Sequence, residues 1–242
     1  MIEDTRRNAK LMVAFPLYKS IPAPVFVRWL GMEKDDVVGT ITTEGVYLPD
    51  AMGQIVEHAM SNNEWDRLVI MEADMLPPIE ALKRVAMYPH ELHVVGSMYF
   101  QHKPPHLPMA YIQEDNIFGP LSPDTVGDWC EHPGVYQVDA VGFGFTSISR
   151  QVLQAWPDDL SMFHSVAKTD TKFPRTGEWK DDPDRPLGSH DLWFCRQAKK
   201  AGYNIFVDTA VQCGHLSETV TGLSDNQSYS LPAEAELIEF NR

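Results

Sequence analysis

The chain has 242 residues, of which 43% are hydrophobic and 22% are charged. This is the composition of an ordinary globular protein, and it excludes a disordered, collagenous or coiled-coil chain. The 34 acidic and 20 basic residues give a formal net charge of −14. A protein that binds a polyanion needs Lys and Arg gathered on one face, and the sequence has no basic block, so we do not expect nucleic acid as a partner. An anionic ligand would need a metal ion or backbone donors to hold it.

Cysteine content and hydrophobic run length indicate the compartment. Cys130, Cys195 and Cys213 are an odd, scattered set and do not describe a disulfide framework. No apolar run approaches the about 18 residues of a membrane span, and the apolar run 11–17 is shorter than the usual core of a signal peptide and is followed by Tyr18 and Lys19. We therefore expect three reduced thiols and a cytoplasmic protein with no transmembrane segment.

In the first hundred residues, short apolar runs alternate with helical patterns. Strands are predicted at 11–15, 37–41, 67–71 and 92–96, and helices at 23–32, 48–60 and 79–86. Pro16 is expected to end the first strand. Strands that alternate with helices favour βαβ units and a mostly parallel sheet.

The second half is less regular. Residues 101–135 are rich in proline, strands are predicted at 135–141 and 145–148 around a glycine pair, and a helix follows at 151–156. The polar stretch 158–188 is expected to be a long loop. A last helix should begin near Ser189 and end at Gly202, before a strand at 204–208 and a polar, acidic tail after Leu216. The chain is therefore predicted to form one α/β domain.

Two carboxylates follow the third predicted strand. Glu72 and Asp74 stand at positions i and i+2 after a buried run, and on extended backbone such side chains point to the same side. Ligands of an open α/β sheet bind at the carboxyl ends of its strands, and carboxylate oxygens suit Mg²⁺ or Mn²⁺. A solvated acidic turn would give the same pattern, so both interpretations stay open.

An aspartate and a histidine near the C-terminus could complete such a site. Asp191 falls in the first turn of the last predicted helix, where a carboxylate is also favoured by the helix dipole alone. His215 follows the last predicted strand. With Asp74 they make a plausible oxygen and nitrogen set for a metal and a base, but spacing does not show that they converge. The segment from His102 to His106 could line an acceptor groove, and we interpret it as a proline-rich surface loop.

The order of four segments resembles the GT-A glycosyltransferases, in particular short, single-domain, family 2-like members from bacteria and phages. The segments are LMVAFPLY at 11–18, LVIMEADMLP at 68–77, VDAVGFGFTSISR at 138–150, and SHDLWFCRQAKKAGYNIFVD at 189–208 followed by CGHL at 213–216. They are similar to the nucleotide-binding strand, the DxD strand, the acceptor-side strand and the helix-to-histidine region of that family. The resemblance implies a single GT-A (Rossmann-like) domain over 1–216, with a nucleotide-binding half at 10–100, an acceptor-side half at 101–216 and a tail at 217–242.

The resemblance also implies a role for each matched position. Metal ligands would be Asp74, His215 and Glu72, with Mn²⁺ or Mg²⁺ as the cofactor, and Asp191 would be the catalytic base. Donor-binding residues would be Pro16, Leu17, Tyr18, Glu72, Ala73 and Asp74, and acceptor-binding residues would be Gly142, Phe143 and Gly144. The expected activity is hexosyl transfer from a nucleotide-diphosphate sugar, such as a UDP- or GDP-sugar, to an acceptor hydroxyl. The acceptor could be a protein, a glycan, a lipid or a small molecule.

Two other functions fit parts of the sequence. A nucleotidyltransferase would share the metal and the nucleotide, but the glycine-rich, basic signature expected near its first strand is absent from residues 16–20. A non-catalytic sugar- or protein-binding module derived from a transferase is the second alternative. The presence of Asp74, Asp191 and His215 argues against a module that has lost its catalytic residues.

Overall fold

The computed structural model describes residues 7–114, 117–156, 162–163, 189–216, 219–221 and 228–230. Most of the loop predicted at 158–188, and most of the tail after Leu216, lie outside the described residues. Within the described part, no helix has both the length and the apolar character needed to cross a membrane.

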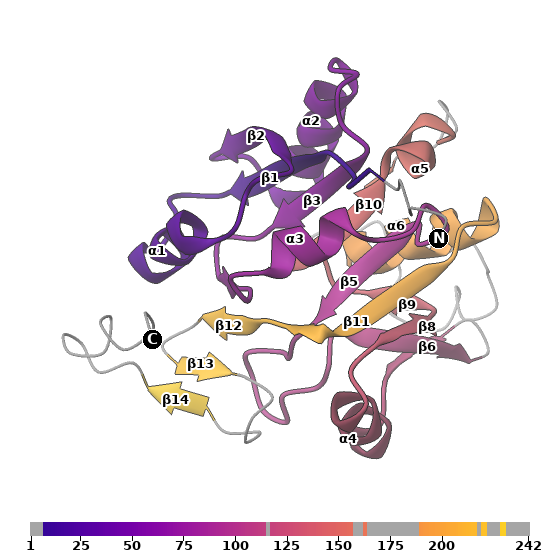
Figure 1. Ribbon diagram of the computed structural model, residues 1–242. Helices are drawn as coiled ribbons and strands as arrows, with labels where there is room; N and C mark the ends of the chain where they lie inside the picture. Colours follow the sequence, from indigo (N-terminus) through magenta and orange to yellow (C-terminus); the bar gives the residue numbers. More distant parts are fainter. Residues whose placement is uncertain are drawn as a thin grey trace, which may run out of the picture.

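The centre of the molecule is a seven-stranded sheet with the order β2-β1-β3-β10-β5-β11-β8 (Figure 1). Its strands are β1 (Leu11–Leu17), β2 (Val37–Glu44), β3 (Arg67–Met71), β5 (Val94–Met98), β8 (Val135–Val138), β10 (Phe145–Ser149) and β11 (Ile205–Gln212). Strands β10 and β8 run antiparallel to their neighbours, and the other strands share one direction. The prediction of a mixed α/β protein with a mostly parallel central sheet is confirmed.

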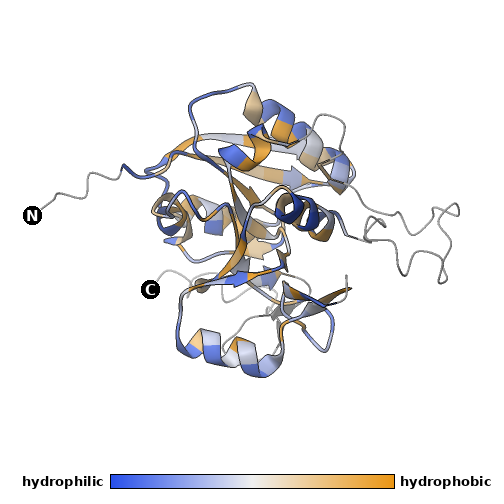
Figure 2. Ribbon diagram, turned by 90° about the vertical axis from the view of Figure 1, so that its right-hand side faces the viewer, coloured by the Kyte–Doolittle hydropathy of each residue, from blue (hydrophilic) through white to orange (hydrophobic). Residues whose placement is uncertain are grey.

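Helices cover both faces of this sheet. They are α1 (Ala23–Gly31), α2 (Leu48–Met60), α3 (Ala81–Ala86), α4 (Pro123–Glu131), α5 (Arg150–Gln154) and α6 (His190–Lys200). Alternate residues of β3 point to opposite faces, so Leu68 and Ile70 pack with α2, α5 and α6, whereas Val69 and Met71 pack with α1 and α3. Figure 2 shows the result: hydrophobic residues concentrate along the central strands, and polar residues cover the outer surfaces of the helices.

Two small sheets extend the domain at one side. The first contains β4 (Met75–Leu76), β12 (Gly214–Leu216), β13 (Thr219–Thr221) and β14 (Ser228–Ser230), and the second contains β6 (Ala110–Glu114), β7 (Ile117–Pro120) and β9 (Ala140–Val141). The stretch 101–135, which the sequence indicates to be irregular, therefore holds β6, β7 and α4. In the first small sheet, the pairing of β4 with β12 places the segment after β3 beside the segment after β11.

The first strand continues through its proline, contrary to the prediction that Pro16 ends it. β1 pairs with β2 as far as Leu17, but its pairing with β3 stops at Ala14. Beyond Ala14, β1 therefore bonds to one neighbour only, and a residue without an N–H is tolerated where no partner strand needs that donor.

The boundaries of the last helix follow the predicted signals. Ser189 occupies the N-cap position of α6, although its side chain makes no capping hydrogen bond. Gly202 has φ of 89°, a backbone conformation that glycine adopts without steric cost and that commonly ends a helix.

Asp208 joins α3 to β11 through hydrogen bonds to its buried carboxylate. Its side chain is 0% exposed and accepts bonds from Arg84 Nε at 2.5 Å, Arg84 Nη2 at 3.0 Å and the Tyr88 hydroxyl at 2.7 Å. The same carboxylate accepts the N–H of Ala210 at 2.9 Å. We expect Asp208→Ala to lower the free energy of unfolding by about 2–4 kcal/mol in urea denaturation, because it leaves these donors without their acceptor.

The neighbouring residue of α3 supplies a matched control. Lys83 contacts Glu33 at 3.0 Å, and both side chains are exposed. Glu33→Ala should change the free energy of unfolding by less than about 1 kcal/mol, because surface ion pairs are screened by water. Equal losses in the two variants would contradict the importance assigned to burial at Asp208.

Candidate metal and transfer site

Several of the candidate site residues gather at the edge of the sheet where its parallel strands end. Asp74 follows the carboxyl end of β3, His102 follows that of β5, and His215 follows that of β11. The turn from Gly142 to Gly144 precedes the antiparallel β10 and therefore lies at the same edge. This is the edge at which open α/β sheets bind ligands.

Asp74, His102 and His215 form one cluster. Oδ2 of Asp74 lies 3.2 Å from Nε2 of His102 and 3.3 Å from Nε2 of His215. The centroids of the two imidazole rings are 3.4 Å apart, with an interplanar angle of 34°. One potential ligand atom from each residue lies within 4.8 Å of the others. The cluster therefore has the donor types and the spacing of a divalent metal site.

Backbone contacts hold this cluster in place. In the pairing of β12 with β4, His215 lies opposite Met75, and the N–H of Leu216 donates to the carbonyl of Asp74 at 2.6 Å. Nδ1 of His215 lies 2.7 Å from the carbonyl of Phe100. In that contact Nδ1 donates to the carbonyl, so Nε2, the ring nitrogen that faces Asp74, is the one placed to bind a metal ion.

The carboxylates around the cluster influence one another. Burial, together with the negative charges of Asp74 and Asp191, raises the pKa of Glu72 to about 8. Burial also raises the pKa of Asp191. At Asp74, burial acts in the same direction, but hydrogen bonds from His215 and His102 outweigh it and lower the pKa. Three neighbouring acids favour the binding of a cation, because a bound cation offsets their mutual repulsion.

The donor set also passes a structural test for a metal ion. Oδ1 of Asp74 and Nδ1 of His102 are buried and have no hydrogen-bond partner among the described residues. Buried polar atoms are usually satisfied, so unpaired atoms at one cluster indicate a ligand or water that belongs there. The unpaired Oδ1 of Asp74, together with the adjacent imidazole nitrogen of His215, therefore fits a divalent cation held by these two residues.

Tyr99 connects the glycine turn to the histidine cluster. Its hydroxyl accepts the N–H of Gly144 at 2.9 Å, and its ring meets that of His215 edge-on with centroids 5.3 Å apart. A Cβ atom on Gly142 would lie 2.2 Å from the Tyr99 hydroxyl, and one on Gly144 would lie 2.7 Å from Met75 Sδ. Both glycines are therefore required by the close approach of Tyr99 and Met75 to the turn.

Asp191 is attached to the same turn from the other side. It is buried at the first turn of α6 and accepts backbone hydrogen bonds from Leu192, at 2.8 Å, and from Phe143. Its negative charge also acts on Glu72, as the raised pKa of Glu72 shows. The base predicted from the sequence thus lies in the same electrostatic environment as the predicted metal ligands.

The remaining predicted site residues occupy different environments. Pro16 is buried and Leu17 half-buried, whereas Tyr18 is 67% exposed just beyond the carboxyl end of β1. The ring of Phe143 packs in the core against Phe194, with centroids 5.2 Å apart. Of the Gly142–Gly144 segment, only backbone and glycine surface could therefore border a ligand.

Sequence reasoning missed two members of the site. His102 was interpreted as part of a surface loop because of the adjoining prolines, and Tyr99 was not singled out. A usable signal existed for both, since they lie in the segment that follows β5, and ligand sites of parallel sheets collect residues after strand ends.

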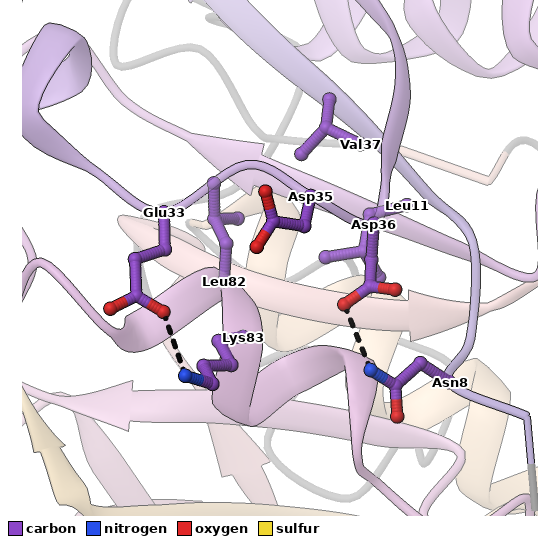
Figure 3. A pocket seen from close by; sticks show the side chains of 8 residues that line it. All are labelled: Asn8, Leu11, Glu33, Asp35, Asp36, Val37, Leu82 and Lys83. Carbon is purple, nitrogen blue, oxygen red and sulfur yellow. Dashed lines mark hydrogen bonds and ion pairs between the residues drawn. The ribbon is translucent and has the colours of Figure 1, made fainter.

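A separate cavity of about 110 Å³ lies near the opposite ends of β1 and β2 (Figure 3). Its lining residues are Asn8, Leu11, Glu33, Asp35, Asp36, Val37, Leu82 and Lys83. Two of the acids already have partners, because Glu33 pairs with Lys83 and Asp36 accepts from Asn8 at 3.1 Å. The cavity shares no residue with the cluster at Asp74, and we assign it no role in the site.

Comparison with known proteins supports the fold. No protein-family model matches the sequence, and no curated protein matches it. Among solved structures, A197 from STIV is similar over 92% of this chain and 94% of its own length, with a TM-score of 0.62 and 15% sequence identity. The inositol-1-phosphate CTP transferase from T. maritima is similar over 87% of this chain and 91% of its own, with a TM-score of 0.44 and 10% identity. At these identities the likeness to A197 shows a common fold alone, and the second likeness carries no inference about this chain.

Proposed function

We propose that the chain is a metal-dependent glycosyltransferase of the GT-A type, similar to family 2, that moves a sugar from a nucleotide-diphosphate sugar to an acceptor hydroxyl. The observation that carries this proposal is the contact between Asp74 and His215 at the carboxyl edge of the sheet, 3.3 Å between Oδ2 and Nε2. Asp191 acts on the same group of acids through Glu72. This combination supplies a cation site and a base, which sugar transfer to a hydroxyl needs.

Asp74 and His215 would hold a divalent ion, with Glu72 near it. When bound, Mn²⁺ or Mg²⁺ supplies charge neutralisation for the leaving diphosphate. The chain needs such help, because its net charge is −14 and the side chains described around Asp74 are carboxylates, imidazoles and Tyr99. On the donor side, Pro16, Leu17 and Tyr18 lie at the end of β1, which neighbours β3, and the exposed ring of Tyr18 is available to stack on a nucleotide base.

Asp191 would accept the proton of the acceptor hydroxyl. Its carboxylate is positioned by backbone donors of Leu192 and Phe143, so its orientation is fixed before the substrate arrives. The backbone of Gly142–Gly144 would border the donor sugar and the acceptor. In this proposal, residues 10–100 form the nucleotide-binding half of the domain and residues 101–216 form the acceptor-side half.

A hydrolysis screen tests the function directly, since a transferase often uses water slowly in place of its acceptor. With a panel of UDP- and GDP-sugars and Mn²⁺, we expect one donor to release its nucleoside diphosphate, and EDTA to stop that release. Chromatography of the nucleotide products is the measurement. Pyrophosphate released from a nucleoside triphosphate and a sugar phosphate would instead identify a nucleotidyltransferase. If calorimetry detected no binding of any nucleotide sugar, with or without Mn²⁺, the proposed function would be wrong.

A further inference from the structure

The cluster at Asp74 contains a histidine that the sequence did not assign to the metal. His102 Nε2 is as close to Asp74 Oδ2 as His215 Nε2 is, at 3.2 Å against 3.3 Å. Both imidazoles therefore present the same type of atom to the same carboxylate oxygen. An ion bound to Asp74 Oδ2 near these two imidazoles would therefore lie close to the Nε2 atoms of both His102 and His215.

Two of the three donor separations match those between ligands of one ion, and the third pair of potential ligand atoms lies within 4.8 Å. Two donors bound to a single ion at about 2.0–2.2 Å lie about 2.8–3.6 Å apart, for bond angles between the octahedral and tetrahedral values. The two distances from Asp74 Oδ2 fall inside that range. The three side chains could thus bind one ion with small adjustments.

The segment that carries His102 is tied down rather than free. Gln101 donates its N–H to the carbonyl of Leu107 at 2.9 Å, and Phe100 forms a β-bridge with Pro108. Nδ1 of His106 lies 2.9 Å from the carbonyl of Gln101. Because Phe100 also accepts from His215 Nδ1, the same short segment positions both imidazoles.

The chemistry of this donor set bears on which ion binds. Mg²⁺ prefers oxygen ligands and retains its water, whereas imidazole nitrogen suits transition metals such as Fe²⁺ and Zn²⁺ and is accepted by Mn²⁺ and Co²⁺ more readily than by Mg²⁺. One carboxylate with one imidazole leaves Mg²⁺ competitive, and a second imidazole shifts the balance toward the transition metals. We propose that His102 is a third protein ligand of this site and makes it select a transition metal such as Mn²⁺ or Co²⁺ over Mg²⁺. This inference rests on the metal site of the proposed function and adds a specificity-determining residue to it.

Metal titrations without nucleotide test the inference, with binding rather than activity as the readout. For the wild-type chain, calorimetry should give an affinity for Mn²⁺ or Co²⁺ at least about tenfold above that for Mg²⁺. The absorption spectrum of bound Co²⁺ should report nitrogen ligands. In His102→Ala, the Mn²⁺ and Co²⁺ affinities should fall by about 10–100-fold, the Co²⁺ spectrum should change, and the Mg²⁺ affinity should change by less than about threefold.

Two further variants separate loss of a ligand from loss of structure. His102→Gln keeps a side chain of similar length in the loop and should lose Mn²⁺ affinity while urea denaturation matches the wild type. Lys103→Ala changes the exposed neighbour in the same loop and should leave both the affinity and the Co²⁺ spectrum unchanged. If both His102 variants bind Mn²⁺ and Co²⁺ as the wild type does, His102 is not a ligand, and the inference fails while the proposed function stands. If the wild-type chain binds no divalent ion, the inference and the proposed metal site fail together.

Discussion

Replacing Asp74 with alanine should remove high-affinity Mn²⁺ binding and lower sugar transfer by on the order of a thousandfold. The carboxylate contacts both imidazoles, at 3.2 and 3.3 Å, and its loss removes the only anionic donor among these three residues. A metal that stabilises a leaving diphosphate contributes several kcal/mol to the transition state, and each 1.36 kcal/mol is about tenfold in rate. The measurements are Mn²⁺ titration followed by electron paramagnetic resonance, and release of nucleoside diphosphate under saturating Mn²⁺.

The matched control is a second aspartate that contacts a histidine but lies on the surface. Asp128 of α4 is 3.7 Å from Nδ1 of His132, and both side chains are exposed. Asp128→Ala should leave Mn²⁺ affinity and turnover at their wild-type values. Full activity of Asp74→Ala would show that the metal assignment is wrong, whatever happens to the control.

The part of the fold that was predictable is the part where local signals agree. The boundaries 48–60 and 67–71 match α2 and β3, because a helical apolar face and a fully buried apolar run are both strong signals. The strands and helix within 101–135 were missed for the opposite reason. Their residues alternate weakly between buried and exposed, and β6 and β7 form a small separate sheet whose pairing depends on β9, which is distant in sequence.

The candidate site, too, was predictable only where local sequence signals were present. Asp74 and His215 were placed together by resemblance to a family, and not by their spacing of more than a hundred residues. The structure explains their contact through the pairing of β4 with β12, two very short strands that periodicity does not reveal. His102 was missed because its proline-rich surroundings indicate a loop, and a loop signal does not say where the loop packs.

A continuous set of contacts joins the proposed base to the proposed metal ligands. Asp191 accepts from the backbone of Phe143, the next residue Gly144 donates to the Tyr99 hydroxyl, and the Tyr99 ring packs against His215. The proposed acceptor side and the proposed metal side are therefore joined by one continuous set of contacts. Catalysis of transfer between two bound substrates benefits from such fixed positions.

Asn in place of Asp191 should separate binding from chemistry. The amide has nearly the shape of the carboxylate but cannot accept the acceptor's proton, so we expect the turnover number to fall by about 10²–10⁴-fold. The affinity for Mn²⁺ and for the donor should change by only a few-fold, since Asp74, His102 and His215 are untouched. Steady-state kinetics with the donor identified by the screen, and calorimetry of donor binding, give the two quantities. The combination expected here, a large loss of turnover with retained binding, differs from that of Asp74→Ala, which should lose both.

Measuring the stability of Asp191→Asn tests whether the loss of turnover results from misfolding. Burial raises the pKa of Asp191, so the charged form is destabilising in the folded protein above its unfolded pKa, and a neutral amide removes that cost. The amide also gives up part of its hydrogen bonding to Leu192 and Phe143, which acts in the opposite direction. We therefore expect the free energy of unfolding of Asp191→Asn at neutral pH to lie within about 1 kcal/mol of the wild-type value.

Asp124 supplies the matched control. It occupies the first turn of α4 as Asp191 does in α6, and Asp124→Asn should leave turnover unchanged. Wild-type turnover in Asp191→Asn would exclude Asp191 as the base and leave its carboxylate with the structural role of a helix N-terminal acid.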